Sequence, residues 1–227
     1  MLFKSMLVSG LLLMQLLASH AHAAKIEDSA FTISSVSVTE VRSMYGNVEL
    51  PANPIGEIIQ IVDGLLALGK KVWPIIEAGK PVITNKLSPA INIIPHLEKE
   101  GGILAEMEKW SRPEVRSYRV SYKNGYNSEV IAFTFTLFFQ HSGAYNGVGS
   151  YVGNLTVQAS EVYVAWGFNF EASSELVGIA NVGTSASPVA SAIIKINYIA
   201  KNIINEHRGA QSVYVDGNGN VQVLKQE

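Results

Sequence analysis

The chain has no cysteine, and this absence removes several kinds of structure and chemistry together. A disulfide framework, a thiolate nucleophile and a cysteine-rich zinc site are all excluded. A lipid anchor on a cysteine at a signal-peptide cleavage site is excluded as well. With 227 residues, of which 48% are hydrophobic, the chain is long enough to be stabilised by the burial of an apolar core alone.

Charge is also sparse and nearly balanced. Only 16% of the residues are charged, and 17 Lys and Arg against 19 Asp and Glu give a formal net charge of −2. No strongly basic segment is present, so nucleic acid is not expected as a partner. Beyond the N-terminus, no apolar run reaches the roughly 18 residues that a transmembrane helix needs.

The first 23 residues have the three parts of a secretory signal peptide. Lys4 supplies the positive charge, an apolar run extends from Met6 to Leu17, and Ala21-His22-Ala23 forms an A-x-A cleavage site. We therefore expect cleavage after Ala23 and a periplasmic or secreted protein, and the lack of cysteine favours a bacterial envelope over a eukaryotic exterior. Residues 24–227 are then expected to form a single β-rich domain.

From residue 115 onward, apolar and polar side chains alternate with a period of two, which is typical of half-buried strands. The alternation is clearest over residues 131–139 and continues over residues 152–159 and 161–171. Asn124-Gly125 and Asp216-Gly217-Asn218-Gly219 predict turns between neighbouring strands. The pattern predicts a mainly β fold, namely an antiparallel β-sandwich or a small barrel-like sheet.

Residues 53–79 have a different pattern. Asn53-Pro54 is a good helix start, because Asn can cap free N–H groups and Pro at the first helical position needs no donor. Apolar residues then recur at near-helical spacing, at Ile55, Ile58, Ile59, Val62, Leu65, Leu66 and Val72. The spacing predicts an N-terminal amphipathic helix packed on the sheet. Because this helix is apolar on a second face too, Leu65, Leu68 and Trp73 are candidates for contact with a partner or a membrane surface.

Few residues could carry chemistry. After the signal segment the histidines are His96, His141 and His207, and no two have the spacing of metal ligands, so neither a metal nor a cofactor is expected. His141 lies in a Gln-His-Ser-Gly segment directly after a very apolar strand, where functional loops are common. A hydrolase with a site near His141 and a loop carboxylate is therefore one hypothesis.

The leading hypothesis is a non-catalytic exported protein that binds an envelope component, a carbohydrate or a protein partner. Binding residues gather in loops at strand ends, and aromatic side chains make good anchors. Tyr126, His141, Tyr145 and Tyr151 are the candidate binding residues. The alternatives are a membrane-associating or pore-forming protein that uses residues 53–79, and the hydrolase.

The signal peptide leads to a direct test. The exported protein should begin at Ala24, because cleavage follows the second small residue of the A-x-A site. N-terminal sequencing of protein recovered from the periplasm or the medium checks this expectation. A recovered chain that still begins at Met1 would contradict it.

Overall fold

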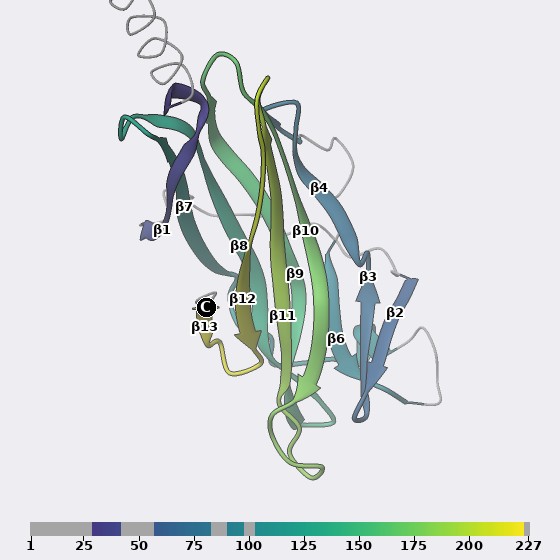
Figure 1. The fold of residues 1–227 in the computed structure, drawn as a ribbon. Helices are drawn as coiled ribbons and strands as arrows, with labels where there is room; N and C mark the ends of the chain where they lie inside the picture. Colours follow the sequence, from purple (N-terminus) through teal and green to yellow (C-terminus); the bar gives the residue numbers. More distant parts are fainter. Residues whose placement is uncertain (1–28, 42–56, 83–89, 98–102, 225–227) are drawn as a thin grey trace, which may run out of the picture.

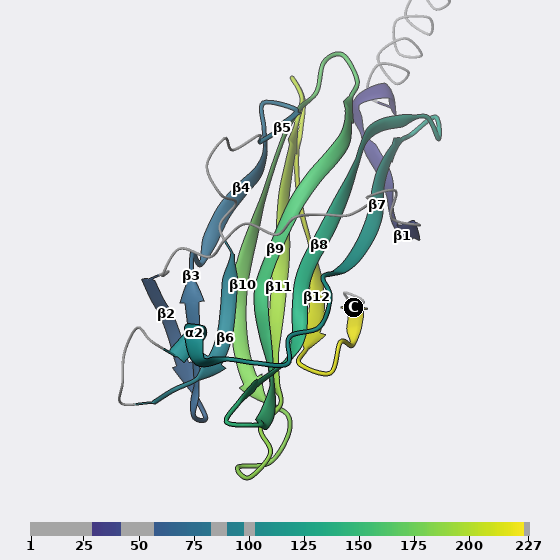
Figure 2. The ribbon, with the colours of Figure 1, turned by 180° about the vertical axis from the view of Figure 1, so that it is seen from behind.

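The computed structural model describes residues 29–41, 57–82, 90–97 and 103–224. These residues form two antiparallel sheets that pack face to face and do not close into a barrel (Figures 1 and 2). The predicted mainly β, antiparallel architecture is confirmed.

Seven strands of the described chain form the first sheet. Their order across the sheet is β1 (Ile33–Val41), β7 (Glu114–Asn124), β8 (Glu129–Tyr145), β9 (Val148–Val164), β6 (Ile91–Pro95), β3 (Leu65–Gly69) and β2 (Glu57–Val62). The six described strands of the second sheet are, in order, β13 (Val221–Leu224), β12 (Glu206–Asp216), β11 (Ala190–Lys201), β10 (Asn169–Asn181), β4 (Val72–Glu77) and β5 (Lys80–Pro81). A single helical turn, α2 (Ile103–Glu106), precedes β7.

The core lies between the sheets, and β8 contributes much of it. The alternate side chains of β8 from residue 131 to residue 139 are fully buried and belong to the core cluster, namely Ile131, Phe133, Phe135, Leu137 and Phe139. Alternate residues of β11 and β12 fill the core from the opposite sheet. The intervening residues Val130, Ala132, Thr134, Thr136 and Phe138 are buried too, so the period of two on β8 separates the side chains that face the other sheet from those on the outer face.

Both predicted turns are present and depend on a carbonyl or carboxylate side chain. In the turn between β7 and β8, the Asn124 side-chain oxygen accepts hydrogen bonds from the backbone N–H groups of Tyr126 and Ser128. Asp216 does the same for the backbone in the turn between β12 and β13. Asn and Asp favour such turns because their short side chains can pair with their own backbone.

The predicted helix over residues 53–79 is wrong. Residues 53–56 lie outside the described residues, and the remainder forms β2, β3 and β4. Two tight turns interrupt the segment, since φ is 49° at Asp63 and 75° at Gly64, and 47° at Ala78 and 72° at Gly79. Two successive residues with positive φ are the geometry of a two-residue hairpin turn, whose twist matches that of antiparallel strands.

The near-helical spacing has a simple origin in buried strands. Leu65, Leu66 and Ala67 on β3 are all buried, so this strand is apolar on both faces and has no period of two. A short apolar run of this kind cannot be distinguished from a helix by periodicity. The Asp63-Gly64 pair and the β-branched residues of β2 were the signals for a hairpin. Within the described residues no helix is long and apolar enough to cross a membrane.

Residues 161–171, which the sequence pattern predicts as one continuous strand, belong to two strands. β9 continues to Val164, and a turn over Ala165–Phe168 separates it from β10. Gly167 takes φ 86°, and the Phe168 N–H donates to the Ala165 carbonyl at 3.2 Å. The alternating sequence concealed this turn, because its side chains keep the same parity as those of the flanking strands.

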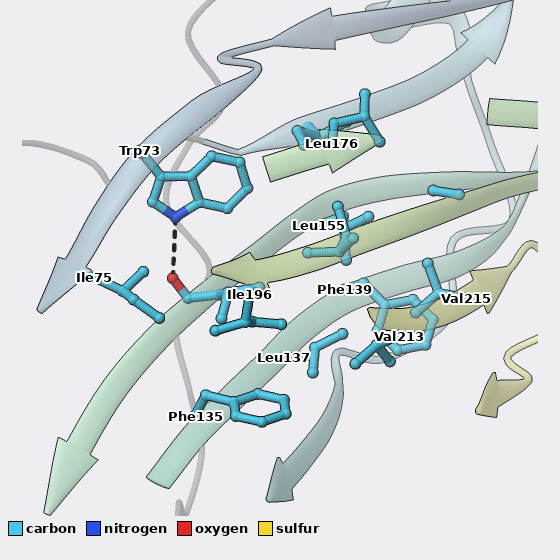
Figure 3. Packing of buried hydrophobic residues seen from close by; sticks show 14 of the residues in the cluster. Trp73, Ile75, Phe135, Leu137, Phe139, Leu155, Leu176, Ile196, Val213 and Val215 are labelled. Atoms are coloured by element: carbon cyan, nitrogen blue, oxygen red, sulfur yellow. Dashed lines mark hydrogen bonds between the residues drawn. The ribbon is translucent and has the colours of Figure 1, made fainter. Parts of the chain in front are cut away.

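A side-chain hydrogen bond from Trp73 joins the two sheets through the core. Trp73 on β4 is only 3% exposed, and its indole Nε1 donates to the backbone carbonyl of Val157 on β9 at 3.2 Å (Figure 3). A buried indole N–H needs an acceptor, and here the acceptor belongs to the facing sheet. Trp73 therefore contributes both apolar bulk and a polar link between the sheets.

Replacement of Trp73 should separate these two contributions. We expect Trp73→Phe to lower the free energy of unfolding by about 1–3 kcal/mol, because part of the bulk remains, and Trp73→Ala to lower it by about 3–5 kcal/mol. Urea denaturation followed by circular dichroism measures both. Trp166→Phe, at an exposed tryptophan, is the matched control and should change stability by less than about 0.5 kcal/mol. Equal stability of all three variants and wild type would contradict this role for Trp73.

Candidate functional site

The four predicted binding residues do not form one site. Tyr126 lies in the turn before β8, whereas His141 and Tyr145 lie at the far end of the same strand. A strand of 17 residues spans roughly 50 Å, so the two groups occupy opposite ends of the sandwich. Tyr151 is only 4% exposed and belongs to the core.

His141 is held by hydroxyl groups. Its ring Nδ1 lies 2.8 Å from Ser142 Oγ, and its backbone N–H donates to Ser111 Oγ at 2.9 Å. No carboxylate is hydrogen-bonded to the ring among the described residues, and the same residues contain no group of three or more metal-ligating side chains. The acid that would orient a catalytic histidine is thus not found at this position.

The residues predicted to form a partner or membrane helix lie in and around the core. Leu65 and Trp73 are buried, and Leu68 is half-buried against the core cluster. The Tyr145 hydroxyl has a hydrogen-bond partner, since it donates to the Glu106 carboxylate at 3.2 Å. None of these side chains forms a separate exposed face of the kind that the sequence suggested.

The structure instead shows a groove where the two sheets leave the sandwich open. It lies between β1, the edge of one sheet, and β12 with β13, the edge of the other, and has a volume of about 650 Å³. The lining residues are Val36, Val38, Tyr198, His207, Arg208, Gly209, Ala210, Gln211, Val223 and Leu224. Ligand sites commonly have this size and this mixture of apolar walls with a few polar groups.

The backbone N–H and C=O groups of successive β12 residues point alternately toward β11 and toward β13. At the end of the strand, the Gly217 N–H donates to the Ala190 carbonyl beside β11, whereas the Asp216 N–H donates to the Asn220 carbonyl on the side of β13. The register between β11 and β12 is unbroken along the whole strand. In an antiparallel ladder, successive residues turn their backbone groups to opposite neighbours, so even-numbered residues of β12 turn away from β11.

Part of this edge has no paired strand within the described chain. β13 pairs only with residues 212–215 of β12, although β12 begins at Glu206. Arg208 and Ala210 line the groove, and no described strand pairs with them on the side away from β11. Gln211 closes the groove toward β13, where its side-chain Nε2 donates to the Leu224 carbonyl at 2.6 Å.

An aromatic cluster lies beneath the groove. The Tyr122 ring meets Tyr198 and His207 edge-on, with centroid separations of 5.7 and 5.8 Å. Gly209 provides room for this cluster, because an added Cβ would come within 2.5 Å of the Tyr198 ring. Tyr122 is fully buried, and no described group is in hydrogen-bonding geometry with its hydroxyl.

Burial raises the pKa of the Tyr122 phenol far above its ordinary value, and the adjacent Tyr198 phenol raises it further. Burial also raises the pKa of Tyr198. Both phenols are therefore neutral at physiological pH, and the floor of the groove carries no charge from them.

The rim of the groove is charged. Glu206, at the start of β12, accepts hydrogen bonds from Lys201 and Arg208, which lower the pKa of its carboxyl. All three side chains are solvent-exposed, so these ion pairs add little to stability. No sequence motif singles out His207, and only the approach of β1 to β12 reveals the groove.

No protein-family model, no curated protein and no solved structure matches the chain. The groove between β1 and β12 is the candidate binding site.

The buried tyrosines predict a loss of stability at alkaline pH. Their folded-state pKa values lie above the unfolded value of 10.0, so the native state binds these protons more tightly than the unfolded state. Their contribution is complete below about pH 10 and declines above it, by up to about 1.4 kcal/mol per pH unit for each tyrosine. Urea denaturation between about pH 8 and pH 11 measures the slope.

Tyr122→Phe is the control for that slope. It should make the alkaline decline shallower, because it removes the Tyr122 phenol whose pKa is raised in the folded state. An alkaline slope that is the same in wild type and Tyr122→Phe would show that Tyr122 does not cause the decline.

Proposed function

We propose that this protein is a non-catalytic binding protein that takes up an extended segment of a partner protein along the open edge of β12. The segment would add a strand beside Arg208 and Ala210, in line with β13. This mode of recognition uses main-chain hydrogen bonds for affinity and alternate side chains for specificity.

The single observation that carries the proposal is the stretch of β12 with which no described strand pairs on the side away from β11. Residues 206–211 amount to roughly 20 Å of strand, which is enough for a short peptide. Natural sheets usually cover or blunt such an edge, because free N–H and C=O groups are a template for another strand. Here the edge opens onto a groove of about 650 Å³.

The walls of the groove define the chemistry of the ligand. Val221 and Val223 on β13 pack against the core, so a strand that continues β13 would turn every second side chain toward the groove floor. Val36 and Val38 on β1 form the facing wall. A segment with small apolar residues at alternate positions therefore fits best, and its other face would remain in solvent.

The open edge fits a protein segment better than a carbohydrate. A peptide strand supplies N–H and C=O groups at the repeat of the β12 edge, whereas a sugar supplies hydroxyl groups without that repeat. A hydrolase near His141 has less support, since no described carboxylate is bonded to that ring. The binding role in the leading hypothesis is thus kept, with a different site.

Ala210→Pro tests strand addition at its central point. Proline removes the Ala210 N–H, which no described strand uses, and edge strands tolerate proline. Peptides selected from a displayed random library against wild type should bind Ala210→Pro at least about tenfold more weakly, because a main-chain hydrogen bond is lost. Titration of a selected synthetic peptide measures the dissociation constant.

Ala210→Ser is the matched control, because it keeps the N–H and adds only a hydroxyl. It should bind the selected peptide like wild type. In wild type, the peptide should also protect the backbone amides of Arg208 and Ala210 from hydrogen exchange. Selected peptides that bind Ala210→Pro as tightly as wild type, without protecting these amides, would overturn strand addition.

A further inference from the structure

Exposed apolar side chains gather at the tips of turns at one end of the sandwich. Trp166, between β9 and β10, is 91% exposed, and Ile203, between β11 and β12, is 85% exposed. Tyr163 and Ile204 beside them are about half exposed. Single exposed apolar residues are ordinary, but a group of them marks an interaction surface. We call Tyr163, Trp166, Ile203 and Ile204 the apolar tip.

The two turns that form the apolar tip are neighbours. Phe31 contacts both, since its ring packs on Phe168 with centroids 5.9 Å apart and its carbonyl accepts a hydrogen bond from the Asn202 side chain at 2.7 Å. Figures 1 and 2 show the loop between β9 and β10 beside the loop between β11 and β12 in both views. Trp166 and Ile203 therefore lie in two adjacent turns.

Several backbone groups of these turns are hydrogen-bonded within the turns. Asn202 Oδ1 accepts the N–H groups of Ile204 and Asn205 at 2.8 and 2.7 Å, and the Asn202 N–H donates to the Asn205 carbonyl at 3.0 Å. In the neighbouring turn the Phe168 N–H donates to Ala165. Backbone that approaches hydrocarbon must be paired in this way, because an unpaired group there is costly.

We propose that the apolar tip docks on the surface of a lipid bilayer, independently of the β12 groove. The tip is convex, and a protein partner would need a recess for each projecting side chain, whereas fluid lipid accommodates them without one. Tryptophan and tyrosine favour the membrane interface, and isoleucine favours the hydrocarbon below it.

The place at which the described chain begins also favours a lipid bilayer as the partner of the apolar tip. Ser29, the first described residue, accepts a hydrogen bond from Gly125 at this end of the sandwich. The 28 preceding residues include the apolar run from Met6 to Leu17 that the sequence assigns to export. The segment that is predicted to direct export therefore precedes the sandwich at the same end as the apolar tip.

Charge behind the apolar tip suits anionic headgroups. Lys201 and Arg208 flank the Ile203 turn, where both pair with Glu206. Cations at this depth attract anionic lipid and strengthen shallow insertion.

Vesicles of phosphatidylethanolamine and phosphatidylglycerol test the proposal with the exported protein. We expect wild type to cosediment with them, and the Trp166 emission to shift to the blue and to be shielded from acrylamide. The double substitution Ile203→Ser, Ile204→Ser should lower the partition coefficient at least about tenfold, because it removes the side chains that enter hydrocarbon.

Val182→Ser is the matched control, since Val182 is also half exposed but lies at the opposite end of β10. It should bind vesicles like wild type, and so should Ala210→Pro, which separates this proposal from strand addition. Failure of wild type to bind vesicles overturns the proposal, including the case in which the tip captures a soluble protein instead. Vesicle binding that the double substitution leaves unchanged overturns it as well.

Discussion

The structure depends on the burial of two apolar sheet faces against each other. Neither sheet could remain folded alone, because each would expose a continuous apolar face to water. Without cysteine, no covalent bond supplements this burial. The Trp73 indole adds one directional contact to it, a hydrogen bond to the Val157 carbonyl on the facing sheet. The alignment of the sheets, and hence the position of every edge and turn, follows from this packing.

Packing of this kind leaves the margins of the sandwich available for function. In the middle, side chains from both sheets fill the space, but β1 and β12 do not meet completely at one edge, and the groove results. At the end that carries Trp166, the turns extend past the core and have no facing sheet. Both proposals therefore concern places at the margin of the two-layer packing. One is the sheet edge at the groove, and the other is the set of turns that forms the apolar tip.

Much of the fold was predictable, because period-two alternation and turn residues act locally. Phe133 and Phe135 on β8 revealed a core-facing strand, and Asp216 revealed the turn after β12. Residues 57–79 were not predicted correctly, since Leu65, Leu66 and Ala67 are buried on both faces of β3 and their apolar run also fits a helix. Greater weight on the turn residues Asp63-Gly64 would have corrected this prediction.

The candidate site was much less predictable than the fold. The sequence alone determined the period of the strands and the lack of cysteine, and it predicts an export signal before Ala24, because each pattern is a property of the sequence itself. Only the tertiary structure decided that Tyr126 and His141 lie at opposite ends, and that Val36 faces Arg208 across a groove. Such neighbours are distant in sequence, and the side chains buried between the sheets decide which of them meet.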